Sequence, residues 1–175
     1  MDIFIEEMIE RKRKWYDVLF VLALAGFSTL VTVVMFSVSV SMPAISSLSF
    51  FIIVGVYYVS YRVAVSRNVE YEYAMVGNEI DIDAIINRKK RKRLTTVNAR
   101  KLEEFGRRSK DASTFEKYAS DITVKKVYAC RDKSDADVCF AVYVEDGIKK
   151  ILVFDPCDEI IETVVKFNPR KTFAV

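Results

Sequence analysis

The run from Val18 to Tyr61 contains no Asp, Glu, Lys, Arg or His. A helix that crosses a bilayer needs about 20 predominantly apolar residues, and this run is roughly twice that length. Pro43, near the middle of the run, cannot continue a helix without losing a backbone hydrogen bond. The sequence therefore predicts a transmembrane hairpin of two helices, at residues 18–40 and 44–61, with a tight turn at residues 41–43.

Composition indicates a separate polar domain after the hairpin. The chain is 51% hydrophobic and 29% charged, and these fractions fit together only if the two kinds of residue are segregated. We expect one cytoplasmic domain at residues 68–175, which is a common domain size. In residues 1–17, Ile5 and Ile9 recur at a spacing of four beside glutamates. This spacing predicts an amphipathic segment, a helix that lies at the membrane interface or leads into the first span.

Basic residues predict the orientation of the hairpin. Residues 11–14 are all Arg or Lys, and Arg62 and Arg67 follow at the other end. Short basic flanks remain in the cytoplasm. We therefore expect a multi-pass protein of the cell membrane, with both termini cytoplasmic and only residues 41–47 outside. Gly26 and Gly55 reach a similar depth in the two spans, which suggests that the helices approach closely there.

A cleaved secretory signal is a poor alternative for the first forty residues. The apolar stretch of a signal is typically ~7–15 residues, and residues 18–40 are longer than that. The cysteines Cys130, Cys139 and Cys157 are odd in number and lack a CxxC spacing. Disulfide-stapled secreted domains have even, dense cysteines, so these three favour a reducing compartment.

After the hairpin, hydrophobicity alternates with the period of a β-strand. Residues 69–75 and 80–86 alternate on either side of Gly77-Asn78, which predicts a two-stranded hairpin with one buried face. Further strands are expected at residues 94–97, 122–130, 138–145 and 148–154, with Asp146-Gly147 as a tight turn. A helix is expected from Pro156 to Phe167, capped by Asp155. Residues 98–120 show no clear pattern.

This order resembles that of bacterial pleckstrin-homology-like (PH-like) domains that follow a transmembrane hairpin. The likeness is carried by Tyr71-Glu72-Tyr73 and by the stretch from Gly77 to Ile82 directly after the second span, and by Phe154-Asp155-Pro156 before the closing helix. The chain is also similar to a small family of bacterial membrane proteins of unknown function. The resemblance implies an α+β fold, in which the hairpin is followed by a bent antiparallel barrel or sandwich with a C-terminal amphipathic helix. It implies a binding or scaffold module and transfers no catalytic residue.

Chemistry-bearing residues are sparse. The sequence has no His, which excludes Ser-His and Cys-His catalysis. Asp81 and Asp83 are paired on one strand face, which we interpret as the solvent side of a hairpin and not as an acid–base or metal site. Cys157 is expected in the first turn of the last helix, where a helix dipole lowers a thiol pKa or where a small side chain simply packs. We therefore predict no enzyme activity, no catalytic residues, no metal site and no cofactor.

A run of six cations is the most informative polar feature: Arg88, Lys89, Lys90, Arg91, Lys92 and Arg93. Nucleic-acid binding is one interpretation, but no recognition helix or set of exposed stacking aromatics accompanies the run. The alternative follows from geometry, because the second strand returns the run to the membrane, where anionic lipids attract cations by ~1 kcal/mol each. A third interpretation is a solvated basic turn that only sets topology.

These patterns together predict a membrane-anchored module whose cytoplasmic PH-like domain binds anionic lipid headgroups or an unidentified protein partner, and no nucleic acid. A structural subunit of a larger membrane assembly is the alternative. We further expect that replacement of all six cations by Ser abolishes lipid binding without unfolding the domain.

Overall fold

The N-terminal segment is a strand of the polar domain. The computed structural model describes residues 4–42, 46–170 and 172–173. β1 (Phe4–Glu10) pairs antiparallel with β2 (Val69–Val76), the first strand after the apolar helices. The chain accordingly divides into residues 13–68, called here the apolar hairpin, and a domain made of the residues up to Lys12 together with those from Val69 onward. The prediction of an interfacial amphipathic segment at residues 1–17, separate from a domain at 68–175, was wrong.

The apolar hairpin consists of two helices, α1 (Trp15–Ser41) and α2 (Ser46–Val65). At ~1.5 Å per residue they are about 40 Å and 30 Å long, against a hydrocarbon core of ~30 Å. Both are long and apolar enough to cross a membrane. They extend a few residues beyond the predicted spans, since Trp15 and Arg62 continue the helical pattern. Part of the predicted turn, including Pro43, lies outside the described residues.

The side-chain hydroxyl groups of α1 donate hydrogen bonds to carbonyls of the same helix, and one of them also contacts α2. In apolar surroundings a hydroxyl needs a partner, and i−4 carbonyls accept hydrogen bonds from the side chains of Ser28, Thr29, Thr32, Ser37, Ser39 and Ser41. Ser28 is buried, and its Oγ lies 2.9 Å from Oγ of Ser60 on α2. A Cβ added at Gly26 or Gly55 would meet no atom within 4 Å. A hydrogen bond between Ser28 and Ser60 therefore joins the helices, and the predicted contact at the glycines was wrong.

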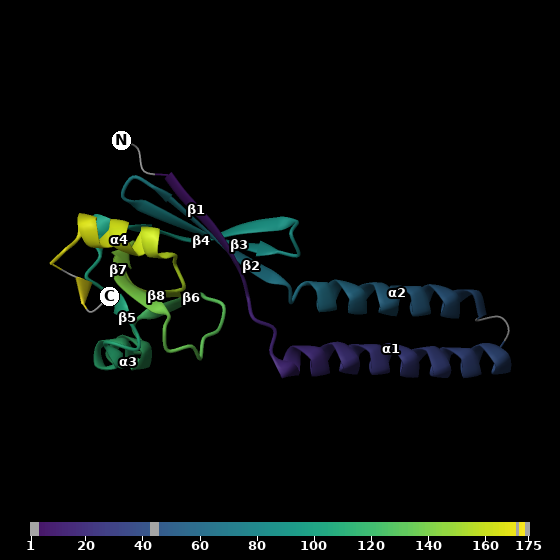
Figure 1. The fold of residues 1–175 in the computed structure, drawn as a ribbon. Helices are drawn as coiled ribbons and strands as arrows, with labels where there is room; N and C mark the ends of the chain where they lie inside the picture. The colour runs from purple at the N-terminus through teal and green to yellow at the C-terminus, as the bar shows by residue number, and fades with distance from the viewer. Residues whose placement is uncertain (1–3, 43–45, 171, 174–175) are drawn as a thin grey trace. The chain divides into compact units, whose positions relative to one another are not determined.

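The first sheet of the polar domain is antiparallel, in the order β1-β2-β3-β4 (Figure 1). β3 is Glu79–Ile86 and β4 is Lys90–Asn98. Gly77 has φ +60° in the turn before β3, a conformation that glycine adopts without strain. The alternation predicted for β2 and β3 is confirmed, with Tyr73, Met75, Ile80 and Ile82 fully buried on the inner face. β4 starts earlier than the predicted strand 94–97, so it includes most of the basic run.

The second sheet has the order β6-β8-β7-β5-β9 and is mixed. Its strands are β5 (Glu104–Arg107), β6 (Lys125–Ala129), β7 (Cys139–Glu145), β8 (Ile148–Phe154) and β9 (Thr172–Phe173). β6 runs parallel to β8, and β9 parallel to β5, so the expectation of a wholly antiparallel domain was wrong. Of the two predicted forms, barrel or sandwich, the structure has the sandwich, because the strands form two packed sheets and not one closed barrel.

Three short helices complete the polar domain: η2 (Ala99–Lys101), α3 (Ala112–Ser120) and α4 (Asp158–Phe167). α3 lies in the stretch without a clear pattern, where Phe115 and Tyr118, one turn apart, pack on the second sheet. The predicted C-terminal amphipathic helix is confirmed as α4, whose Ile160 and Val164 are fully buried.

Hydrogen bonds from buried side chains join the two sheets. The hydroxyl of Tyr73 on β2 donates to the carbonyl of Ala129 on β6, and it accepts from the backbone N–H of Asp155 at 3.2 Å. Thr95 Oγ1 on β4 lies 2.6 Å from the hydroxyl of Tyr143 on β7. Because a buried polar group without a partner costs free energy, these bonds also fix how the sheets pack.

Candidate functional site

The outer face of the first sheet carries arginines interleaved with carboxylates. Glu72 on β2 and Asp83 on β3 are register partners, and both are buried. Two carboxylates directly opposite each other repel, so this arrangement requires cations nearby. Arg91 and Arg93 on β4 supply them: Arg91 pairs with Glu72, and Arg93 pairs with Asp83. The predicted solvent side of the hairpin is therefore covered by the basic run.

Further ion pairs extend this layer. Arg93 Nη1 lies 2.8 Å from Asp81 Oδ1. Arg88 lies in the turn between β3 and β4, where its Nη2 is 3.0 Å from Glu10 Oε1 and its Nε is 2.7 Å from Glu70 Oε1. Hydrogen bonds to these carboxylates raise the pKa of Arg88. The carboxylate partners of Arg91 and Arg93 likewise raise the pKa values of those two arginines.

The geometry of the turn places Arg88 against its partners. Asn87 and Arg88 have φ values of 53° and 52°. Two adjacent residues with positive φ are typical of the type I′ turn, which matches the twist of a hairpin. A non-glycine residue in this region is strained by roughly 1–2 kcal/mol. The contacts of Arg88 with carboxylates on β1 and β2 offset part of that cost.

The three lysines of the run behave differently from the arginines. Successive side chains of a strand point to opposite faces, so Lys90 and Lys92 point away from the carboxylates that Arg91 and Arg93 contact. Lys89 lies in the turn itself. All three are exposed, and within the described part of the chain none forms an ion pair. The predicted six-residue site is thus divided into three arginines in ion pairs and three exposed lysines.

The net positive charge around the basic run is far lower in the fold than the run of six cations suggests. The carboxylates of Glu10, Glu70, Glu72, Asp81 and Asp83 surround the arginines, and all five belong to neighbouring strands. This composition removes most of the basic surplus that would support binding to a polyanion such as nucleic acid.

The lysines lie at the end of the sheet where the chain enters and leaves the apolar hairpin. Ile86, just before the turn, is the register partner of Val69, and Val69 O accepts a hydrogen bond from Arg11 N at 3.1 Å. Only four residues separate β1 from α1, and three separate α2 from β2. The register of β2 with β3 therefore returns the basic run to this end of the sheet, and the predicted return to a membrane stays a prediction.

Cys157 lies at the N-terminal end of the last helix. It is the N-cap residue of α4, and Glu7 Oε2 accepts a hydrogen bond from its backbone N–H at 2.7 Å. Burial raises the pKa of the Cys157 thiol, and the charge of Glu7 acts in the same direction. Asp155, the predicted cap, instead lies 3.2 Å from Arg131 Nε in an ion pair. Burial and the charge of Glu7 both oppose the lowering of the thiol pKa by the helix dipole, so they favour the interpretation of Cys157 as a small side chain that packs.

Two packed sheets with a closing helix are the architecture of a PH-like module. A family model described as a bacterial PH-like domain matches residues 1–174. The chain belongs to this family, DUF6106. No match was found among curated proteins or among solved structures. The family match covers β1 as well as the later strands, in agreement with a single domain that the apolar hairpin interrupts.

Proposed function

We propose that this chain is a non-enzymatic, membrane-anchored module whose PH-like domain contacts anionic lipid headgroups through Lys89, Lys90 and Lys92. The observation that carries the proposal is the division of the basic run. The arginines are committed to carboxylates, whereas the lysines are exposed and without ion pairs within the described ranges. They project from the end of the sheet that continues into the apolar helices.

The pairing of β1 with β2 supports a hairpin that crosses the membrane twice. The two strands flank the apolar hairpin in sequence, and they pair over their whole length, from Phe4 with Val76 to Glu10 with Glu70. Paired strands must share one compartment, so the chain between them crosses a bilayer an even number of times. The basic residues 11–14 favour the cytoplasm as that compartment.

Weak headgroup contacts are sufficient for a domain that is already anchored. A lysine near an anionic surface contributes ~1 kcal/mol, so three contribute about 3 kcal/mol. This is modest for recruitment from solution. A tethered domain, however, is held at a high effective concentration near the lipid, and this energy then suffices to orient it. The function of the lysines is accordingly to set the orientation of the domain.

The direct test measures lysine reactivity in the full chain. We suggest reconstitution into nanodiscs of phosphatidylcholine alone, or of phosphatidylcholine with phosphatidylglycerol, followed by brief acetylation and mass spectrometry. Lys89, Lys90 and Lys92 should react several-fold more slowly in the anionic discs, and 1 M salt should remove the difference, because the Debye length falls to ~3 Å. Lys126, exposed on the second sheet, is the internal control. Equal rates in both discs would exclude the lipid contact.

A second candidate function is that of a subunit in a membrane assembly. Phe4 and Val76 are register partners on the outer face of the first sheet, and Met8 lies two strand repeats further along the same face, beyond Glu6. They are 66%, 54% and 60% exposed, which is high for apolar side chains clustered on one face. If this face binds a protein, full chains with Phe4→Glu and Met8→Glu should lose a partner that the parent chain retains in a native-detergent pull-down. A Val144→Glu chain, altered at an exposed apolar residue of the second sheet, is the control.

A further inference from the structure

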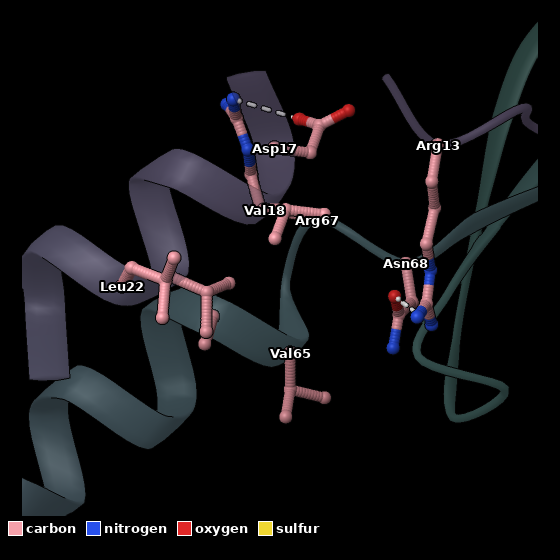
Figure 2. A pocket seen from close by; sticks show the side chains of 9 residues that line it. Arg13, Asp17, Val18, Leu22, Val65, Arg67 and Asn68 are labelled. Atoms are coloured by element: carbon pink, nitrogen blue, oxygen red, sulfur yellow. Dashed lines mark hydrogen bonds and ion pairs between the residues drawn. The ribbon is translucent and has the colours of Figure 1, made fainter. Parts of the chain in front are cut away.

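The apolar hairpin contains a cavity of about 380 Å³ between one end of α1 and the facing end of α2 (Figure 2). Its wall consists of aliphatic side chains from both helices, among them Val18, Leu22 and Val65. Its rim is polar and is formed by Arg13, Asp17, Arg67 and Asn68. The volume is within the range of small-ligand sites, about 300–1,000 Å³.

One of the two rim arginines, Arg67, has its charge balanced by a carboxylate. Arg67 Nη2 lies 3.0 Å from Asp17 Oδ1, and the Asp17 side chain is only 10% exposed. The guanidinium of Arg67 also lies over the ring of Phe20, at 4.8 Å from its centroid. These contacts fix Arg67 as a structural part of the rim, in which charge and countercharge are already matched.

The other rim arginine keeps its charge. Arg13 Nη2 donates to the amide oxygen of Asn68 at 2.9 Å, and Figure 2 shows this pair apart from the Asp17–Arg67 pair. An amide orients a guanidinium without neutralising it, and no carboxylate of the described residues pairs with Arg13. The remaining donors of Arg13 form a preorganised cation at the mouth of an apolar cavity.

We propose that this cavity binds one anionic phospholipid, with the phosphate at Arg13 and an acyl chain along the aliphatic wall. The charge of Arg13 favours an anionic ligand. The aliphatic wall favours an anion that carries a hydrocarbon chain. Val18 and Leu22 are 56% and 62% exposed, so the cavity opens to the surroundings of the helices, where lipid chains would lie. Basic pockets at the ends of membrane helices are known to hold anionic headgroups. The site consists of hairpin residues alone and does not depend on the lysines of the PH-like domain.

The test titrates phosphatidylglycerol into delipidated full chain in detergent, with native mass spectrometry as the measurement. The parent chain should retain one phosphatidylglycerol, bind phosphatidylcholine several-fold more weakly, and show no binding of inorganic phosphate. Arg13→Gln should weaken phosphatidylglycerol binding about fivefold, the factor expected for one cation near an anionic headgroup. Arg62→Gln, which removes a charge from α2 outside the cavity, should leave it unchanged.

A second pair of variants tests the aliphatic wall of the cavity without changing any charge. Leu22→Trp fills the cavity and should prevent retention of the lipid, whereas Leu19→Trp, on α1 but outside the cavity, should not. Retention of the lipid by both Arg13→Gln and Leu22→Trp would overturn the proposal, as would equal affinity for phosphatidylcholine. The acetylation pattern of Lys89, Lys90 and Lys92 should be the same in all four variants, so failure here is distinguishable from failure of the headgroup contact.

Discussion

Glu7 and Cys157 are 150 residues apart in sequence, and a carboxylate oxygen of Glu7 accepts the backbone N–H of Cys157 at 2.7 Å. In a capping box, a glutamate within the helix reaches back to the N-cap N–H. Here the glutamate comes from β1 instead, and its negative charge lies at the positive end of the dipole of α4. The first strand thereby stabilises the last helix of the same domain.

Replacement of Glu7 should destabilise the domain. Glu7→Gln removes a charge-assisted cap, and we expect a loss of about 1–2 kcal/mol in the free energy of unfolding. The measurement is urea denaturation of the full chain in detergent, followed by circular dichroism. Glu6→Gln, at the exposed neighbouring position, is the matched control. Equal stability of the two variants would show that the contact does not cap α4.

The polar domain should fold without the apolar hairpin only if β1 is kept. Ile9 is 2% exposed and belongs to the core, so a chain that starts at Val69 lacks core volume and exposes the edge of β2. A chain in which roughly 4–6 turn residues replace 13–68 should give a soluble, cooperatively folded domain, because antiparallel neighbours need only a short loop. Size-exclusion chromatography and thermal melting distinguish the two. A cooperative melt of residues 69–175 alone would contradict the role of β1.

The arginines of the basic run should be needed for folding. Arg91→Ser with Arg93→Ser leaves Glu72 and Asp83 adjacent, buried and without their cations. Loss of one side of a buried pair is strongly destabilising, and we expect a smaller but clear fall in the free energy of unfolding here because the arginines are half exposed. Further replacement of the carboxylates by Gln and Asn should recover most of that loss. Lys90→Ser with Lys92→Ser is the control and should melt like the parent chain. This revises the expectation that all six cations are dispensable for the fold.

The predicted topology can be tested at the end of α1. In a chain whose three cysteines are replaced by Ala, Ser41→Cys should react with an impermeant maleimide added outside intact cells. A cysteine at Lys126, on the polar domain, should react only after the membrane is opened. The reverse pattern would place the PH-like domain outside the cell.

Stability should fall at alkaline pH. Burial raises the pKa of Tyr143 from 10.0 to about 12, and burial likewise raises that of Cys139 from 9.0 to about 12. Because their folded-state pKa values are raised, the contribution of both groups is complete below their ordinary values and is lost as pH rises toward 12. Tyr143→Phe should flatten the pH dependence of the unfolding free energy above pH 10. An unchanged slope would contradict this assignment.

Much of the fold follows from sequence where one physical rule acts alone. The uncharged run predicts the apolar hairpin, and the alternation on either side of Gly77-Asn78 and Asp146-Gly147 predicts the strand pairs there. A helix was predicted in place of β1 because Ile5 and Ile9 lie four residues apart. This spacing places side chains on one face of a helix and also on one face of a strand. Only pairing with β2, far away in sequence, decides between the two.

The place of the basic run in the sheet was predictable from the sequence, but the ion pairs of its arginines were not. Strand lengths alone return the basic run to the end of the sheet where the hairpin begins. Its division into arginines and lysines depends on the register of β4, which shifts at Ile82/Asp83 of β3. An irregularity of this kind arises from cross-strand packing and leaves no signal in the local sequence.

The position of β1 also imposes an order on biosynthesis. The ribosome releases β1 before the apolar hairpin and β2 after it, so under the proposed topology the first strand must wait for its partner until both intervening helices have entered the bilayer. A chain that inserted only one helix would leave the two strands in different compartments, with Ile9 exposed and α4 without Glu7. Under the proposed topology, the first sheet can be completed only after both helices have been inserted, and we expect a chain that fails this step to present an unfolded domain to cellular proteases.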